Sequence, residues 1–283
     1  MSLQDLVDYH LHTAVTVDAN MTEAEACQRA VALGLREIAF TNHVMLAQPD
    51  YTISPEELVD HWAQIQVCQQ RYPQLTIRLG LEMDYYEGRE DDIAATIQRY
   101  ENLIGRPFDF ILGAIHHLNG VFFGPTRNAP LLFDHQEVEA IYHDYFVLMA
   151  KAVRSGLFDV MAHPDLIKKY TGKFHPPVPF DRYRTPVEAF IVRLLEAEVG
   201  IEVNPSGLRR PVAEIYPSDE LLSLYLSEAK ARGVEPIITL GSDAHQLERV
   251  GECLYEGVMA LQRVGHNTIT LFEKKERIPF HLW

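Results

Sequence analysis

Short apolar runs alternate with amphipathic segments along most of the chain. The segment after each run often begins with a helix-capping residue and ends near a glycine, which indicates a helix. Thr22 with Glu25 and Ser54 with Glu57 form two capping boxes, and Pro55 follows the second cap at the first helical position. The apolar runs that we interpret as strands are 6–11, 37–41, 76–82, 108–115, 158–162, 201–204 and 236–241.

Seven strand-then-helix units in one chain predict an α/β fold with a parallel sheet. Their number favours closure of the sheet into a barrel. No linker divides the chain, so we expect a single domain over residues 1–283, with one more short strand at 268–272. Two irregular segments rich in glycine or proline, 117–134 and 171–185, interrupt the pattern and could cover an active site.

The composition narrows the class of protein. The chain has 283 residues, of which 47% are hydrophobic, so it can bury a large core. A formal net charge of -15 argues against broad contact with nucleic acid or with an anionic membrane. Three separated cysteines without a pair motif indicate free thiols in a reducing compartment. With no visible signal peptide or membrane-spanning run, we expect a cytoplasmic protein.

Candidate metal ligands gather at the carboxyl ends of the expected strands, where barrels of this kind build active sites. Asp8, His10 and His12 share one face if residues 8–12 form a strand. Imidazoles and carboxylates without thiolates suit Zn, Mn or Fe, and they are too many for one ion. We therefore expect a cluster of two or three ions and hydrolytic chemistry. The strand-end residues are His10, His12, His43, Glu82, His116, His163, Asp243 and His245.

At these strand ends the chain resembles the polymerase and histidinol phosphatase (PHP) superfamily of metal-dependent phosphoesterases. The resemblance implies a distorted (β/α)7 TIM-like barrel that holds up to three metal ions. Finer signatures at 80–85, 165–169 and 204–218 look like those of the histidinol-phosphate phosphatases. The matching motifs are Asp8-x-His10-x-His12 with Asp18 after it, Thr41-Asn42-His43, Gly80-Leu81-Glu82, Gly113-Ala114-Ile115-His116, Ala162-His163-Pro164 and Gly241-Ser242-Asp243-Ala244-His245.

The resemblance also implies a role for each ligand. His10, His12, Glu82 and Asp243 would bind the first ion, and Glu82 would bridge to a second ion held with His116 and His163. Asp18, His43 and His245 would bind the third ion. Asp8 would orient a histidine from behind, and His43, Asp243 and His245 are the expected catalytic residues.

The expected reaction is hydrolysis of a small phosphate monoester, and the expected substrate is L-histidinol phosphate, an intermediate of histidine biosynthesis. A metal-bridging hydroxide would attack phosphorus in line. Arg209 is the expected phosphate ligand, with Arg210 as the second candidate and Ser242 as a further donor. The cationic part of the substrate could contact Asp84, Glu87, Asp165 or Tyr85.

Other functions stay open at this point. The chain could act on another sugar or nucleotide phosphate, or it could be a PHP nuclease, which its acidic charge disfavours. An amidohydrolase would be expected to have a bridging lysine, whereas this chain offers Glu82. A structural metal-binding module without activity is the non-enzymatic alternative. The sequence does not fix the oligomeric state, and a homodimer is compatible with it.

Overall fold

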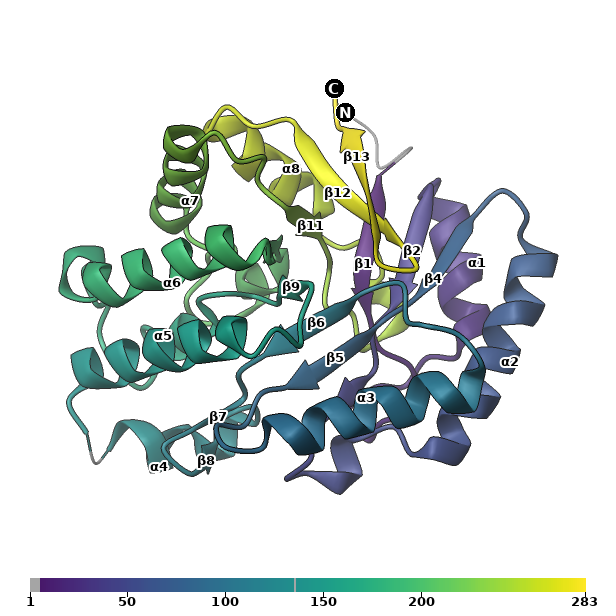
Figure 1. Cartoon of the computed structure of the whole chain (residues 1–283), viewed down its shortest axis with the longest axis horizontal. Helices are drawn as coiled ribbons and strands as arrows, with labels where there is room; N and C mark the ends of the chain where they lie inside the picture. Colours follow the sequence, from purple (N-terminus) through teal and green to yellow (C-terminus); the bar gives the residue numbers. More distant parts are fainter. Residues whose placement is uncertain (1–5, 135) are drawn as a thin grey trace.

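The computed structural model describes residues 6–134 and 136–283; His135, a candidate helix start, lies outside them. Seven strand positions surround a common axis, and two of these positions are split (Figure 1). The strands are β1 (Val7–Leu11), β2 with β3 (Glu37–Phe40, His43–Val44), β4 with β5 (Thr76–Leu79, Leu81–Asp84), β6 (Ile111–Ala114), β9 (Val160–Met161), β10 (Gly200–Val203) and β11 (Ile238–Leu240).

The strands form a closed parallel barrel, as predicted. One sheet runs β1-β2-β4 and the other runs β11-β10-β9-β6-β5-β3, with every pair in them parallel. The ends meet where Leu11 pairs with Ala244 just after β11. The amide of His12 donates to the Ala244 carbonyl at 2.9 Å, and the Ala244 amide donates to the His10 carbonyl at 3.2 Å.

The second and third strands change sheets midway, which distorts the barrel. The break between β4 and β5 falls at Gly80, where an added Cβ would lie 2.9 Å from the carbonyl oxygen of Phe110. Only glycine allows the neighbouring backbone to come so close. The break between β2 and β3 falls at Thr41 and Asn42, and the Asn42 side chain accepts a hydrogen bond from the amide of Thr13 at 2.8 Å. Both breaks lie next to predicted ligands.

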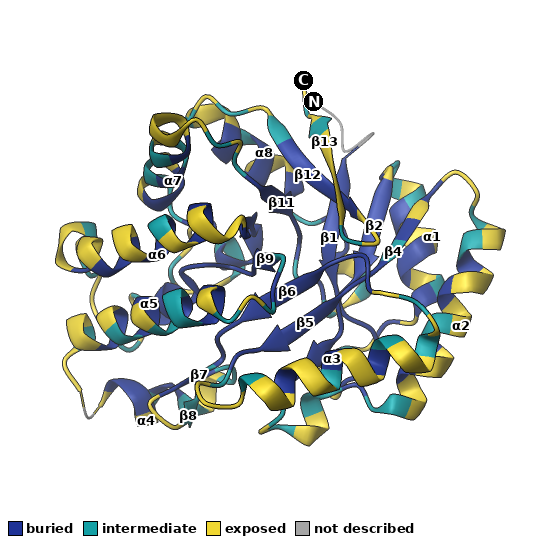
Figure 2. Ribbon diagram, viewed as in Figure 1, coloured by how far each residue is buried: buried dark blue, intermediate teal, exposed yellow. Residues whose placement is uncertain are grey.

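Helices cover the outside of the barrel and turn their buried faces toward it (Figure 2). Both predicted capping boxes are present, at Thr22 and at Ser54. The helices are α1 (Glu23–Leu33), α2 (Pro55–Arg71), α3 (Glu90–Ile104), α5 (Val138–Arg154), α6 (Arg184–Ala197), α7 (Asp219–Arg232) and α8 (Leu254–Arg263).

A C-terminal hairpin covers the end of the barrel at which the strands begin. The predicted strand is β12 (Thr268–Glu273), and it pairs with a second strand, β13 (Glu276–His281), which we did not predict. Phe272 is fully buried, and its amide donates to the Tyr9 hydroxyl at 3.1 Å. Strand β13 is mostly exposed and contains Pro279, a residue that disfavours strands, so the alternation of Ile278 and Phe280 is a weak strand signal.

The first irregular segment is more ordered than its composition suggests. It contains a small hairpin, β7 (His117–Leu118) and β8 (Val121–Phe122), followed by η2 (Thr126–Asn128) and α4 (Ala129–Phe133). The second segment contains η4 (Phe180–Arg182), and its His175 ring packs 4.6 Å from the ring of Phe133. The two segments therefore lie against each other.

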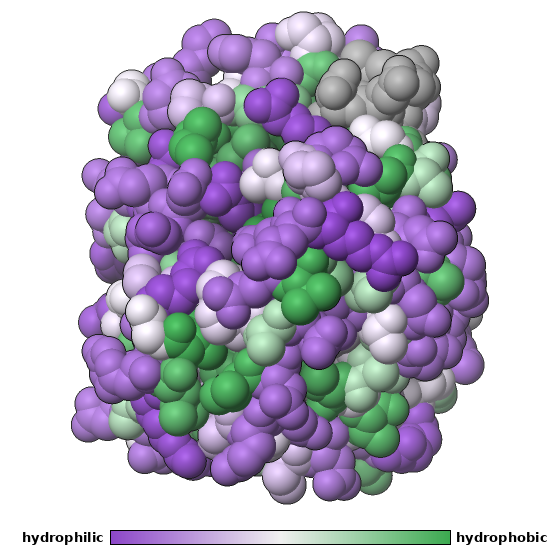
Figure 3. All heavy atoms as spheres, turned by 90° about the vertical axis from the view of Figure 1, so that its right-hand side faces the viewer, coloured by the Kyte–Doolittle hydropathy of each residue, from purple (hydrophilic) through white to green (hydrophobic). Residues whose placement is uncertain are grey.

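The face that forms the right-hand side of Figure 1 is a mixed surface (Figure 3). Hydrophobic residues occur there in small groups among hydrophilic ones. Within the described part of the chain, no helix has both the length and the apolar character needed to cross a bilayer.

Candidate metal centre and active site

A cavity of about 190 Å³ opens at the carboxyl ends of the barrel strands. Six of the nine predicted metal ligands line it, together with two cations and a group of apolar side chains. None of the described residues of segment 171–185 is among the lining residues, whereas Phe122, Gly124 and Pro125 of segment 117–134 are. The ligands at its wall are Asp18, His43, His116, His163, Asp243 and His245.

Glu82 lies at the centre of the ligand cluster, and its two oxygens face different imidazoles. Oε2 lies 3.2 Å from His10 Nε2 and 3.5 Å from His12 Nε2. Oε1 lies 2.8 Å from His163 Nε2 and 3.8 Å from His116 Nε2. A carboxylate placed in this way can bridge two cations.

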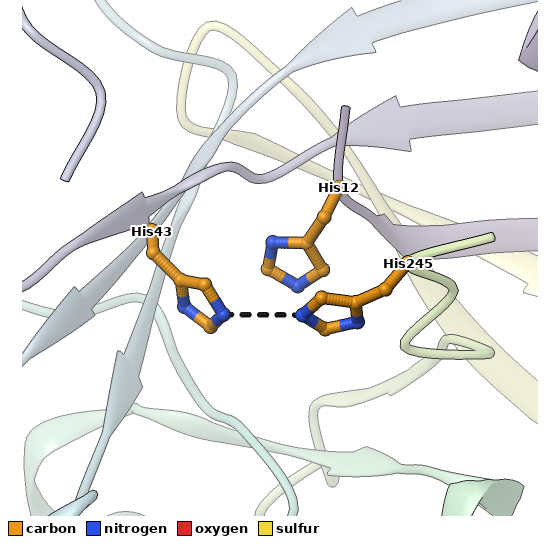
Figure 4. Close-up of side chains that lie close together, drawn as sticks. All are labelled: His12, His43 and His245. Carbon is orange, nitrogen blue, oxygen red and sulfur yellow. Dashed lines mark hydrogen bonds between the residues drawn. The ribbon is translucent and has the colours of Figure 1, made fainter. Parts of the chain in front are cut away.

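A second group of side chains lies beside the first. The rings of His12, His43 and His245 converge, and the Nε2 atoms of His43 and His245 are 3.3 Å apart (Figure 4). Asp18 Oδ2 lies 3.4 Å from His43 Nε2 and 3.3 Å from His245 Nε2. Asp243 Oδ1 lies 3.5 Å from His12 Nε2. All nine predicted ligands therefore lie in one contiguous cluster.

The donor set fits divalent metal ions. His10 Nε2, His12 Nε2 and Glu82 Oε2 are buried and make no hydrogen bond within the described residues. Buried polar atoms without partners are costly, and a cation among them would satisfy them together. Four overlapping groups, each of three ligand atoms within 4.8 Å of one another, can be drawn from the cluster. Imidazole and carboxylate donors suit Zn, Mn and Fe.

Two residues at the centre of the cluster, Glu82 and His12, have the charge states that metal binding requires. Burial alone would raise the pKa of the Glu82 carboxyl, but the imidazoles of His43 and His10 hold that pKa well below its usual range. Burial and the neighbouring imidazoles of His245 and His43 lower the pKa of His12 well below its usual value. Glu82 is therefore ionised and His12 is neutral, the states in which both side chains coordinate a metal. Burial would lower the pKa values of His10 and His43, but the carboxylates beside them raise both pKa values well above their usual range, and a bound cation would displace those protons.

Carboxylates behind the cluster orient two of the histidines. Glu202 Oε1 lies 2.7 Å from His10 Nδ1, and Asp84 Oδ1 lies 2.6 Å from His116 Nδ1. Each contact places the proton on Nδ1 and leaves the Nε2 lone pair facing the cluster. We did not predict either role. A signal for Glu202 was available, because it is the one acidic residue within a short apolar strand, where it must be buried.

Glu202 binds the two sides of the cluster together. Its Oε2 accepts hydrogen bonds at 2.9 Å from the backbone amide of His163 and from Asn204 Nδ2. A Cβ atom at Gly241 would lie 2.5 Å from Glu202 Oε1 and 2.5 Å from the Cβ of His10. A glycine at the end of β11 is therefore required for this contact.

Asp8 and Ser242 differ from their predicted roles. Asp8 accepts from the Ser242 amide at 2.8 Å, the Ser242 hydroxyl at 2.6 Å and the Gly251 amide at 2.9 Å, so it fixes the loop after β11 instead of a histidine ring. Ser242 is fully buried with its hydroxyl turned to Asp8. Its side chain is therefore not placed to donate to a phosphate in the cavity.

The two candidate arginines exchange their predicted ranks. Arg209 Nη2 donates to the carbonyls of Ser242 at 2.9 Å and Asp243 at 3.2 Å, and its Nη1 pairs with Glu252 at 3.1 Å. These contacts use the guanidinium to hold the loop that carries Asp243. Arg210 lines the cavity, whereas Arg209 does not. Arg210 is therefore the better candidate for a phosphate ligand.

The candidate contacts for the cationic part of the substrate lie elsewhere. Asp84 holds His116, and it also lies 3.0 Å from His117 Nδ1. Asp165 pairs with Lys168 at 2.9 Å. Neither carboxylate, nor Tyr85 or Glu87, is among the residues that line the cavity.

Lys169 also lines the cavity, although the sequence pattern predicted no role for it beyond its place in the 165–169 signature. It is 6% exposed and lines the cavity together with Arg210. Burial lowers the pKa of Lys169 to about 7, and the charge of Arg210 contributes to this shift.

The chain is similar in sequence to known proteins. The family model described as "PHP domain" matches residues 8–206. A probable histidinol-phosphatase of Deinococcus radiodurans is 32% identical over 275 residues, which cover 95% of this chain and 98% of the relative. The histidinol-phosphatase of Bacillus subtilis is 28% identical over 274 residues, which cover 86% and 95% of the two chains.

The fold also matches a solved structure. The crystal structure of histidinol phosphate phosphatase from Lactococcus lactis, complexed with Zn, L-histidinol and phosphate, superposes with a TM-score of 0.80. The match covers 97% of this chain and 99% of that one, at 21% identity, and it supports the barrel fold. With a family match over most of its length and a relative aligned almost end to end, the chain belongs to the PHP domain family.

Proposed function

We propose that this PHP protein hydrolyses L-histidinol phosphate to L-histidinol and inorganic phosphate, using two or three divalent ions chosen from Zn, Mn and Fe. The observation that carries the proposal is the cluster around Glu82, in which nine potential ligands lie together and six of them line a cavity. The relatives named histidinol-phosphatase, one of them 32% identical, support the substrate.

The resemblance to the PHP superfamily implies that the ligands divide into three sets. His10, His12, Glu82 and Asp243 would hold the first ion, and Glu82 with His116 and His163 would hold the second. Asp18, His43 and His245 would hold the third. When bound, such ions lower the pKa of a water molecule, orient the phosphoryl group and stabilise the charge that develops on it.

The protein's own residues prepare this site. Glu202 and Asp84 hold His10 and His116 in the tautomer that points a lone pair into the cluster. Arg210 would grip the phosphoryl oxygens from the cavity wall. His43, Asp243 and His245 remain the proposed catalytic residues, since they line the cavity in which the ester would lie.

An aromatic wall beside the cluster suits a flat leaving group. Tyr51 and Phe122 line the cavity and form an edge-to-face pair with ring centroids 5.2 Å apart. Phe122 stacks in turn on His117 at 4.7 Å, and Asp84 anchors His117. The imidazole ring of histidinol could pack on this wall, because aromatic rings favour such contacts.

The rival functions have less support. A nuclease would need a basic path for the strand, whereas the net charge is -15. We therefore include no nucleic acid or membrane among the proposed partners. A cytoplasmic location belongs to the proposal, since Cys27, Cys68 and Cys253 are free thiols. A homodimer stays a prediction.

The test is release of inorganic phosphate from L-histidinol phosphate by protein reconstituted with Mn or Zn. We expect kcat/KM above roughly 10⁴ M⁻¹s⁻¹. p-Nitrophenyl phosphate and a short single-stranded DNA serve as parallel substrates. Slow, indiscriminate cleavage of p-nitrophenyl phosphate with no release from histidinol phosphate would refute the substrate.

A variant separates catalysis from a purely structural metal. His43→Ala should abolish turnover, because His43 lies at the cavity wall between Glu82 and Asp18. If the metal were purely structural, the unmodified protein would show no turnover, and His43→Ala would only lower its melting temperature.

A further inference from the structure

Lys169 is a buried lysine whose amino group meets no opposite charge among the described residues. Its Nζ donates to the carbonyl of Gly124 at 2.6 Å and lies 4.9 Å from the ring centroid of Tyr170. No carboxylate oxygen of the described residues lies within 4.0 Å of it. A carbonyl dipole and an aromatic face solvate an ammonium group only in part.

Among the described residues, the other buried lysine, Lys168, and the half-buried Arg78 are both paired with carboxylates. The neighbouring Lys168 lies 2.9 Å from Asp165 and 3.0 Å from Glu214. Arg78 pairs with Glu37 at 2.8 Å. A buried charge is costly unless an opposite charge meets it, so the exception at Lys169 points to an anion that arrives from outside the protein.

The position of Lys169 says where this anion would lie. Lys169 and Arg210 line the same cavity as His163 and Asp243. Arg210 is exposed, and it also has no carboxylate partner among the described residues, unlike Arg209, which pairs with Glu252. Two basic side chains without carboxylate partners among the described residues therefore line the same cavity as six of the proposed metal ligands.

We propose that Lys169 and Arg210 form a two-cation clamp that selects terminal phosphoryl groups over phosphodiesters. The inference rests on the proposed phosphatase function and assigns a specificity-determining role to Lys169. A phosphate monoester carries roughly 1.5 to 2 negative charges at pH 7, because its second pKa is about 6. A diester carries one negative charge, so it neutralises only part of the clamp and compensates less of the cost of burying the Lys169 charge.

The low pKa of Lys169 agrees with a site that awaits an anion. Burial and the nearby Arg210 lower this pKa to about 7, and Asp243 opposes the shift. A dianion between the two cations would favour the charged form of the lysine.

The experiment compares two substrates with the same leaving group, p-nitrophenyl phosphate and bis-p-nitrophenyl phosphate, on the metal-loaded protein. In Lys169→Met and Lys169→Gln, the ratio of kcat/KM for the monoester to that for the diester should fall about 10- to 100-fold, as expected for loss of a charge-assisted hydrogen bond. Inhibition by inorganic phosphate should weaken by a similar factor. Lys230→Met, which removes an exposed lysine on α7, is the matched control and should leave the ratio unchanged.

Thermal melting separates this role from a structural one. If Lys169 serves the substrate, removing its charge should leave the melting temperature unchanged or raise it, because the free protein loses an unpaired buried cation. An unchanged ratio, an equal loss on both substrates, or a lowered melting temperature would each overturn the proposal. The two p-nitrophenyl esters do not include histidinol phosphate. The clamp can therefore be refuted while L-histidinol phosphate remains the substrate, and L-histidinol phosphate can be refuted while the clamp remains.

Discussion

Replacing Glu202 by glutamine tests whether the carboxylate behind the cluster prepares the metal site. Glu202 is fully buried and accepts three hydrogen bonds, from the His10 ring at 2.7 Å and from the His163 amide and Asn204 side chain at 2.9 Å each. Glutamine has nearly the same shape, but it offers one acceptor oxygen where glutamate offers two. Whichever way the glutamine amide is turned, at least one of the three hydrogen bonds that Glu202 accepts is therefore lost.

The two orientations fail for different reasons. If the amide nitrogen faces His10 Nδ1, it donates to that nitrogen and moves the ring proton to Nε2, the atom that faces Glu82 at 3.2 Å. If the amide nitrogen faces His163 and Asn204, three donors meet without an acceptor. Hydrogen bonds to a charged group contribute about 1.5–3 kcal/mol. Loss of such a partner typically lowers metal affinity by about 10- to 100-fold, or about 1.4–2.8 kcal/mol.

The assay is competition for Zn²⁺ between the apoprotein and a chelating dye. We expect the affinity of the tightest site to fall about 10- to 100-fold in Glu202→Gln. Glu276→Gln removes an exposed carboxylate on β13 and should leave the affinity unchanged. An unchanged affinity in Glu202→Gln would refute the reasoning, and so would a large loss of apoprotein stability without any loss of affinity.

Four further substitutions probe the cavity wall and the loop after β11. Arg209→Ala should lower the free energy of unfolding by about 1–3 kcal/mol, because it frees the loop after β11. Arg210→Ala should raise KM for the phosphate ester and leave the melting temperature unchanged. The reverse pattern would indicate that Arg209, and not Arg210, binds the phosphate. Phe122→Ala should raise KM for L-histidinol phosphate about 10-fold but not KM for glycerol phosphate, and equal rises would exclude a wall for the leaving group. Since the pKa of Lys169 in the folded protein is about 7, against an ordinary value of 10.5, the unfolded chain binds more protons between these values. In urea unfolding of the apoprotein, wild type should therefore gain stability over Lys169→Met as pH rises above 7, by about 1.4 kcal/mol per pH unit, and a difference that is flat with pH would contradict this.

The barrel and the residues of the candidate metal centre could be predicted from the sequence. Parallel strands bring their carboxyl ends to one edge of a sheet, so residues as far apart as His12 and His245 can be assigned to one site from strand order alone. Capping boxes such as that of Thr22 and Glu25 are local signals, and the structure contains them where they were expected. The ligand motifs are local too, since each occupies a few residues at one strand end.

The contacts that each side chain makes around these residues could not be predicted from the sequence. His10 and Glu202 lie 192 positions apart in the sequence, and only the pairing of β10 with its neighbours in the barrel brings them to 2.7 Å. Arg209 and Arg210 are adjacent and of one type, yet the end of η5 (Pro205–Arg209) turns one toward the loop after β11 and leaves the other at the cavity. A pattern along the chain records which residues share a strand end, because that depends on backbone direction. It does not record where a side chain points or which partner comes back to meet it, because both depend on packing between segments that are distant in the sequence.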